Sequence, residues 1–156
     1  MRTFRGVFLI LLGWVGIGCD SNRIFDDWVH LEGGQWNRGE KKEYTFFIKD
    51  SLAYYDCWTN LRINKDFSFS NIFMQVELTS PDLKKQQMLL EFTLADDQGR
   101  WMGKGLGDLY DFHLLHPQLK ELRLNKNGAY KISMKQVMRS GALPGVLAHG
   151  ISIIKH

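Results

Sequence analysis

Apolar and polar residues alternate along most of the chain after Glu43, which is the spacing of a β-strand with one buried face. Four successive runs show this period of two, and turn-forming residues such as Asp, Asn, Ser and Pro separate them. A helix would need an apolar period of about 3.6 residues, so we predict four strands. Their apolar faces are Tyr44, Phe46 and Ile48; Tyr55, Cys57, Leu61 and Ile63; Ile72, Met74, Val76 and Leu78; and Met88, Leu90, Phe92 and Leu94.

Shorter strand signals follow in the second half of the chain. Residues 122–124 predict a short strand and residues 151–153 a last one. Residues 130–138 carry one apolar face, which we interpret as a strand, with a short helix as the alternative. About seven strands with no long helix predict an all-β fold, an antiparallel β-sandwich for which the jelly roll is a candidate topology.

Residues 100–116 interrupt the alternation. Gly103, Gly105 and Gly107 stand at alternate positions, where they prevent a stable helix and weaken any strand. A phosphate-binding loop would need a helix directly after the glycines, and the sequence predicts none. We therefore predict an irregular, Gly-rich crossing loop whose backbone passes close to another element.

The first nineteen residues have the pattern of a bacterial lipoprotein leader. Arg2 and Arg5 precede a short apolar run, and small residues lead from it to Cys19. The run is too short to favour a permanent membrane span. We expect cleavage before Cys19 and acylation of its thiol and new amino terminus, although Gly16 stands where the strongest pattern has leucine. An ordinary signal peptide and a disulfide between Cys19 and Cys57 are the alternatives.

These signals divide the chain into three parts. Residues 1–18 are predicted to be a lipoprotein signal peptide, and residues 43–156 the β-sandwich domain. Residues 19–42 are predicted to be a lipidated tether, because turn-forming residues are frequent there. We expect Trp28 and Trp36 to fold this tether partly back onto the domain.

Charge and composition change this picture little. The chain has 20 basic and 17 acidic side chains, and the basic excess includes Arg2 and Arg5 of the leader. The mature chain is therefore close to neutral, which gives no argument for nucleic acid as a partner. Aromatic residues make up 13% of the sequence and glycine is frequent, as suits an exported β-rich domain.

The polar residues form no recognisable catalytic or cofactor motif. His113 and His116 are three residues apart, but no helix and no further cluster of Cys, His or Glu joins them into a metal site. Asp96 and Asp97 suit a turn better than a glycosidase pair. Cys57 lies on the apolar face of its strand, so we expect it to be buried. We predict a protein that is not an enzyme, with no cofactor and no metal.

Three aromatic residues are candidates for a partner or ligand surface. Trp58 and Phe73 fall on the polar faces of their strands, and Trp101 lies at the start of the Gly-rich stretch. Exposed aromatic side chains often mark binding surfaces. The alternative is that they pack beneath the N-terminal segment or the Gly-rich crossing.

Several stretches together resemble the GldH family, gliding-motility lipoproteins of the Bacteroidetes. The most telling is DDQGRWMGKGLGDLYD at residues 96–111, and none of the stretches is a catalytic motif. Their specificity comes from occurring together and in order over the whole mature domain. The others are CDSNR at 19–23, NLRIN at 60–64, FSNIF at 69–73, GAYKI at 128–132, QVMR at 136–139 and LPG at 143–145.

The resemblance implies a non-enzymatic cell-envelope lipoprotein. It would support gliding motility and the associated type IX secretion machinery through contacts with other envelope proteins. Only Cys19 carries over as a functional residue, as the attachment point for fatty acids such as palmitate. We expect a membrane anchor, no nucleic acid partner, and a periplasm-facing position on the outer membrane. The alternative is a carbohydrate- or other ligand-binding lipoprotein that uses Trp58, Phe73 or Trp101 as stacking platforms.

Overall fold

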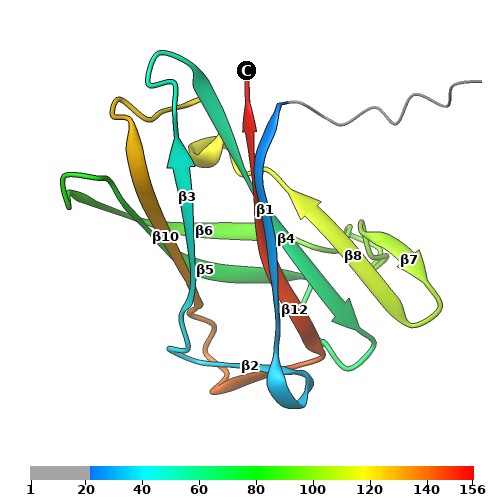
Figure 1. Ribbon diagram of the computed structural model, residues 1–156. Coiled ribbons are helices and arrows are strands. Elements are labelled where there is room, and N and C mark those ends of the chain that lie inside the picture. The colour runs from blue at the N-terminus through cyan, green and yellow to red at the C-terminus, as the bar shows by residue number, and fades with distance from the viewer. Residues whose placement is uncertain (1–21) are drawn as a thin grey trace, which may run out of the picture.

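The computed structural model describes residues 22–156, most of which lie in antiparallel strands (Figure 1). The predicted signal peptide and the lipidation site Cys19 lie outside these residues. Within residues 22–156, no helix has the length and apolar character needed to cross a membrane.

Two antiparallel sheets form a sandwich. The larger sheet has the order β1-β12-β4-β8-β7, with β9 paired to β4, and the smaller has the order β3-β10-β5-β6. The larger sheet contains β1 (Arg23–His30), β4 (Tyr54–Asn64), β7 (Lys104–Leu106), β8 (Leu109–Leu114), β9 (Leu122–Arg123) and β12 (Val146–Lys155). The smaller contains β3 (Lys42–Ile48), β5 (Asn71–Thr79), β6 (Lys85–Thr93) and β10 (Gly128–Gln136). A short ribbon pairs β2 (Gln35–Asn37) with β11 (Ala142–Pro144), and the 3-10 turns are η1 (Glu32–Gly34) and η2 (Pro117–Leu119).

The pairing of the long strands is that of a jelly roll. Among the described residues, eight strands have six or more residues: β1, β3, β4, β5, β6, β8, β10 and β12. In chain order, the first pairs with the eighth, the second with the seventh, the third with the sixth and the fourth with the fifth. This nested pairing folds a long hairpin over into two sheets. The predicted antiparallel β-sandwich and its candidate topology are therefore confirmed.

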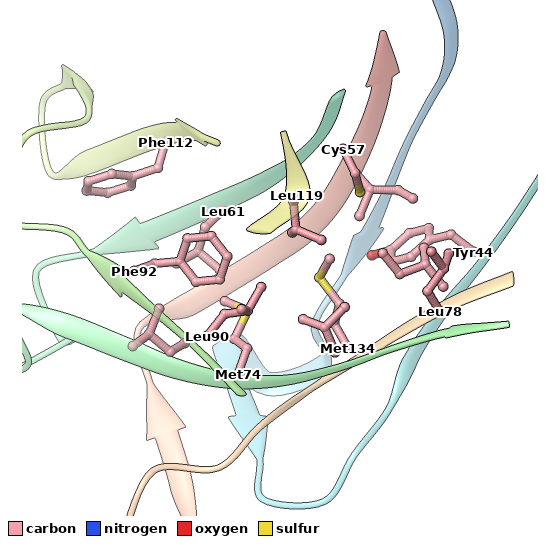
Figure 2. Close-up of a cluster of buried hydrophobic side chains, with 14 of the residues drawn as sticks. Tyr44, Cys57, Leu61, Met74, Leu78, Leu90, Phe92, Phe112, Leu119 and Met134 are labelled. Carbon is pink, nitrogen blue, oxygen red and sulfur yellow. The ribbon is translucent and has the colours of Figure 1, made fainter. Parts of the chain in front are cut away.

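Alternating side chains from both sheets fill the space between them. Figure 2 shows Leu61 of β4 facing the cluster formed by Met74 of β5, Leu90 of β6 and Met134 of β10, all fully buried. Burying a side chain of this size contributes about 1.5–3 kcal/mol, so this interface is the main source of stability. Cys57 lies in the same core as expected, and burial raises the pKa of its thiol to about 12. It therefore acts as a small apolar side chain.

The prediction of irregular structure before residue 43 is wrong for β1 and β2. β1 pairs along its length with β12, so that Asp26 lies opposite Ser152 and Trp28 opposite Gly150. A partner strand more than a hundred residues away supplies these backbone hydrogen bonds, and a local pattern cannot show it. Trp36 folds back onto the domain as expected: it is fully buried, and its Nε1 atom donates to the backbone oxygen of Glu40.

The predicted irregular Gly-rich crossing is also wrong. β7 and β8 form a hairpin on the larger sheet, and Gly107 takes a positive φ of 62° in its turn. The expected close approach does occur, because a Cβ atom on Gly103 would lie 2.8 Å from the backbone oxygen of Asp111. Pairing with β8, which itself pairs with β4, overrides the weak strand preference of glycine. Residues 130–136 are likewise strand, and the helical alternative is excluded there.

Candidate functional site

The outer face of the larger sheet gathers polar side chains from four neighbouring strands. Register places Asp26 of β1 opposite Ser152 of β12, and Asn60 of β4 opposite His113 of β8. Trp58 of β4 lies opposite Ser152. Successive side chains of a strand point to opposite faces, so these five residues share the face that points away from the core.

A chain of hydrogen bonds joins four of these side chains. Asn60 Nδ2 donates to Ser152 Oγ at 2.8 Å, and Ser152 Oγ donates to Asp26 Oδ1 at 2.9 Å. The other end of the Asn60 amide, Oδ1, bonds to Nδ1 of His113. Because an amide oxygen only accepts, Nδ1 of His113 carries the proton and Nε2 is left as an acceptor. The chain fixes the tautomer and orientation of the imidazole.

The imidazole of His113 is neutral near pH 7. Burial lowers its pKa, and the positive charges of Arg23 and Lys104 lower it further, against an opposing contribution from Asp26. The ring lies parallel to that of Trp58, with centroids 4.2 Å apart. His113 therefore covers much of the indole, whose Nε1 atom has no hydrogen-bond partner within the described residues.

These side chains border a pocket of about 340 Å³ between β1 and the β7–β8 hairpin. We call it the outer-face groove and define it by Asp26, Trp28, Asn60, Lys104, His113 and Ser152. Trp28 is partly exposed in it, and its indole lies against Gly150, where a Cβ atom would come within 2.8 Å of the ring. The groove thus combines flat aromatic surface with fixed hydrogen-bonding groups and both signs of charge.

A bidentate ion pair holds one wall of the groove. Arg62 donates from Nε and Nη2 to the two carboxylate oxygens of Asp111, at 2.6 and 2.8 Å. The guanidinium lowers the pKa of the Asp111 carboxyl. This pair ties β4 to β8 on the outer face, and both side chains are more than a third exposed, so its contribution to stability is at most about 1 kcal/mol.

The geometry of the groove suits binding. The hydroxyl of Ser152 donates to Asp26 and His113 bonds to Asn60, so serine and histidine are not arranged as nucleophile and base. Residues 22–156 hold no group of three His, Cys, Asp or Glu side chains placed to bind a metal ion. His116 lies elsewhere, with its ring against Phe92 at a centroid distance of 5.6 Å.

One carboxylate of the predicted turn, that of Asp96, has a local structural role. Asp96 accepts hydrogen bonds from the backbone N–H groups of Gln98 and Arg100, both at 2.9 Å. The Arg100 guanidinium donates to the same carboxylate. Asp96 therefore closes the turn as the sequence predicted.

The three aromatic residues proposed as a binding surface lie in separate places. Trp58 is in the outer face of the larger sheet beneath His113, which belongs to the Gly-rich stretch. Phe73 lines a different pocket of about 520 Å³ on the smaller sheet, with Leu89 and Met138. Trp101 packs on the core, within 6.4 Å, centroid to centroid, of the rings of Phe67, Tyr110 and Phe112. The structure does not bring these three side chains together into one platform.

Sequence reasoning missed most of the groove. Asp26, Asn60 and Ser152 belong to no catalytic or cofactor motif, and the sequence offers His113 only as one of two spaced histidines that form no metal site. The one signal available was the alternation of Trp58 and Asn60 with buried residues in β4. That alternation predicts an outer face for one strand and says nothing about which strands lie beside it.

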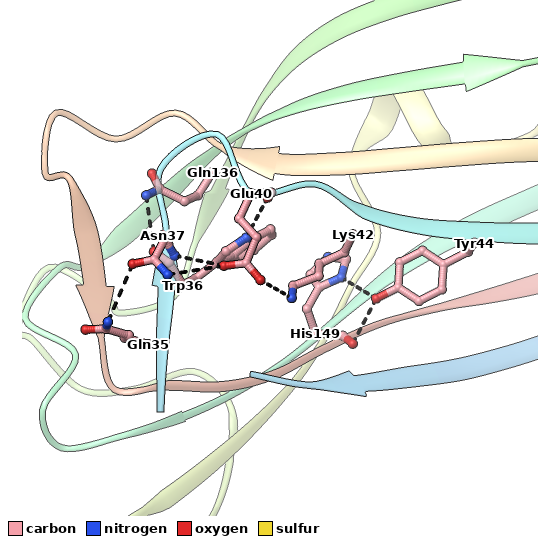
Figure 3. A network of polar contacts seen from close by, with 8 residues as sticks. All are labelled: Gln35, Trp36, Asn37, Glu40, Lys42, Tyr44, Gln136 and His149. Atoms are coloured by element: carbon pink, nitrogen blue, oxygen red, sulfur yellow. Dashed lines mark hydrogen bonds and ion pairs between the residues drawn. The ribbon is translucent and has the colours of Figure 1, made fainter. Parts of the chain in front are cut away.

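Figure 3 shows a second polar network, whose inner part is buried: Tyr44 of β3 and His149 of β12 lie beside the buried ring of Trp36 of β2. The hydroxyl of Tyr44 lies 2.7 Å from Nδ1 of His149 and donates to the backbone oxygen of His149 at 2.9 Å. Burial lowers the pKa of His149 to about 3 and raises that of Tyr44, so both side chains are neutral at pH 7. The Tyr44–His149 pair is closed to solvent and links β3 to β12.

Comparison with known proteins places residues 23–153, nearly the whole described domain, in one protein family. Residues 23–153 match the family described as GldH lipoprotein. The chain is 30% identical over 149 residues to the gliding motility lipoprotein GldH of Flavobacterium johnsoniae, covering 95% of this chain and 91% of that protein. It is 28% identical over 148 residues to the gliding motility lipoprotein GldH homolog of Christiangramia forsetii, covering 94% and 89%.

Likeness to solved structures is weak. A crystal structure of the infectious bursal disease virus VP2 subviral particle aligns with a TM-score of 0.37 and 13% identity. The alignment covers 85% of this chain and 30% of the viral chain. A score this low has no bearing on function.

Proposed function

Because the chain belongs to the GldH lipoprotein family, which makes it a gliding-motility lipoprotein, we propose that it is a non-enzymatic component of the envelope machinery for gliding. In this proposal Cys19 is acylated and anchors the domain to a membrane. The domain then supports the gliding machinery and the associated type IX secretion system by contacts with other envelope proteins. The observation that carries the proposal is the family match over residues 23–153, and the leader predicted at residues 1–18, directly before Cys19, supports it.

The outer-face groove is the surface that we assign to these contacts. Protein interfaces concentrate binding energy in aromatic side chains surrounded by polar groups, and Trp28 lies beside Asp26 and Lys104 in this groove. A hydrogen-bond chain already orients His113 and Asn60, so binding costs little side-chain entropy there.

The lipid anchor would strengthen weak contacts. Anchoring confines the domain and its partners to one plane, which raises their effective concentration. Two or more acyl chains on Cys19 would give stable attachment. We place the domain on the periplasmic side of the outer membrane, because no acidic run follows closely after Cys19.

A carbohydrate ligand in the same groove is the second candidate. Trp28 offers a flat, partly exposed indole, and the pocket beside it contains donors and acceptors from Lys104, Asn60 and Asp26. This combination suits a polar ring with apolar faces. Binding of an envelope polysaccharide that is abolished by Trp28→Ala would favour this candidate over a protein partner.

Cross-linking in native envelopes followed by affinity purification tests the first proposal. Wild-type protein should recover gliding or secretion components, and Cys19→Ala should recover far less. Lys104→Ala in the groove should also reduce recovery, whereas Lys131→Ala on the outer face of the smaller sheet should not. Failure of the wild type to recover any gliding or secretion component would refute the proposal.

A further inference from the structure

Apolar side chains are exposed at one end of the sandwich, where the edge strands β1 and β3 approach each other. A groove of about 530 Å³ opens there, bordered by Ile24 and Phe25 of β1, Phe46 and Phe47 of β3, Tyr55 and Lys155. Phe47 is 65% exposed and Ile24 is 39% exposed. Phe47 and Ile24 therefore offer apolar surface that no other part of residues 22–156 covers.

The turn between β3 and β4 adds Leu52 to the same end. Leu52 is 81% exposed, and its backbone N–H donates to the carboxylate of Asp50 at 3.1 Å. The same carboxylate pairs with Lys155 at 2.8 Å, and the hydroxyl of Tyr55 donates to the backbone oxygen of Asp50 at 2.7 Å. An ordered turn, tied to the last strand, therefore holds Leu52 out into solvent.

Tyr54 completes this surface. It is partly exposed, and the guanidinium of Arg123 lies 5.0 Å from the centre of its ring. An aromatic ring with a polar tip and a neighbouring cation is a combination favoured where apolar material meets water. Ile24, Phe47, Leu52 and Tyr54 are called the apolar end below.

The described chain begins at this same end. The backbone oxygen of Asn22 accepts from the N–H of Lys155 at 2.8 Å, and Figure 1 shows the start of β1 beside the C-terminus and the β3–β4 turn. Cys19 precedes Arg23 by four residues, a length that spans at most about 14 Å when fully extended. An acylated Cys19 would therefore keep this end within about 14 Å of its attachment point in the membrane.

We propose that the apolar end rests on the bilayer that holds the lipid anchor, with Leu52 and Phe47 among the lipid headgroups. This inference relies on the proposed acylation of Cys19. The occupant is a lipid surface because the short tether brings a bilayer to these side chains before any other partner. β4 has 11 residues and leads away from this end, so Lys65 beyond its far end would stand up to about 35 Å from the membrane. The domain would then be oriented as well as anchored.

Fluorescence quenching in vesicles tests this orientation. The full, acylated protein carries Leu52→Cys or, as the matched control, Lys65→Cys, each labelled with an environment-sensitive dye. Cys57 is buried and its thiol pKa is raised, so it stays unlabelled. The proteins are reconstituted into vesicles of phosphatidylethanolamine and phosphatidylglycerol that contain lipids brominated near the headgroup. Mass spectrometry measures acylation, and flotation measures attachment to the vesicles.

We expect brominated lipid to quench the dye at residue 52 at least about twofold more than the dye at residue 65. A dye at Phe47→Cys should also be quenched, and adding Leu52→Asp should reduce that quenching while flotation is unchanged. Equal quenching at residues 52 and 65 in an acylated, floating protein would overturn the orientation and leave the lipid anchor intact. A protein that is neither acylated nor floats would overturn both. A dye at residue 52 that is shielded from water in native envelopes, but is not quenched by brominated lipid in the vesicles, would indicate a protein partner and would also overturn the proposal.

Discussion

The imidazole of His113 lies flat against the indole of Trp58, with ring centroids 4.2 Å apart and an interplanar angle of 3°. The two residues are 55 positions apart, and only the pairing of β4 with β8 brings them together. The same histidine is hydrogen-bonded through Asn60 and Ser152 to Asp26 on the far side of β12. The His113 side chain therefore both covers the indole of Trp58 and belongs to the chain of hydrogen bonds in the outer-face groove.

Replacement of His113 should expose Trp58. His113→Ala removes the ring that covers the indole, so tryptophan emission should shift to longer wavelength and quenching by acrylamide should increase. Stability should fall by about 1 kcal/mol, the usual size of an aromatic contact and its hydrogen bond. Denaturant unfolding and fluorescence measure the two effects.

The change in emission should depend on Trp58. Adding Trp58→Phe should abolish the difference between His113→Ala and its parent. His30→Ala, an exposed histidine on the same sheet, should have no such effect. An unchanged emission spectrum in His113→Ala would show that the histidine does not shield the indole.

Gly150 should not accept a side chain. A Cβ atom there would lie 2.5 Å from the backbone oxygen of Asp27 and 2.8 Å from the ring of Trp28, so Gly150→Ala must push β1 away from β12. We expect a loss of about 1–3 kcal/mol in unfolding free energy. Gly141→Ala is the matched control, because nothing lies within 4 Å of its Cβ position. Equal stability of the two variants would contradict the close contact between Trp28 and Gly150.

His149 should make the fold sensitive to acid. In the unfolded chain its pKa is the ordinary value of 6.5, whereas burial lowers the folded-state pKa to about 3. Between these values the unfolded chain binds a proton that the folded chain does not. The contribution of a neutral, buried His149 to the unfolding free energy is therefore complete above about pH 6.5. Below that pH the unfolding free energy falls, by up to about 1.4 kcal/mol per pH unit.

Removing this histidine should flatten the pH dependence. His149→Phe keeps a ring against Trp36 and keeps the backbone oxygen to which Tyr44 donates, but cannot bind a proton. Between pH 6.5 and 4, its unfolding free energy should fall less steeply than that of the wild type in urea titrations. Parallel curves for the two proteins would mean that His149 titrates normally in the fold.

The strands with a clean alternation could be predicted from the sequence, and those with a distant partner could not. Tyr44, Phe46 and Ile48 face the core because period two places them on one side of β3, and the same reasoning located β4, β5, β6 and β10. β1 contains Asp26 and Asp27 within an otherwise apolar segment, which weakens its alternation. Its strand conformation depends on hydrogen bonds from β12. The β7–β8 hairpin cannot be predicted for a similar reason, since β7 is held by pairing with β8, and β8 by pairing with the distant strand β4.

To predict the groove from the sequence, one would need the register of the strand pairs as well as the strands themselves. Asn60 lies beside His113 because the register of the β4–β8 pair places these two residues opposite each other. In the same way, the register of the β1–β12 pair places Asp26 opposite Ser152. A shift of one residue in either ladder would turn these side chains into the core. Sequence alternation gives the face of each side chain, and the long-range register that assembles a site comes from packing of the whole sandwich.

The speed of gliding cells in which Cys19→Ala is the only copy of the protein tests the central claim most directly. If the protein is a lipid-anchored component of the gliding machinery, these cells should lose gliding, and the variant should leave the membrane fraction while keeping its folded domain and normal abundance. Wild-type gliding by cells that contain only this unanchored variant would contradict the account.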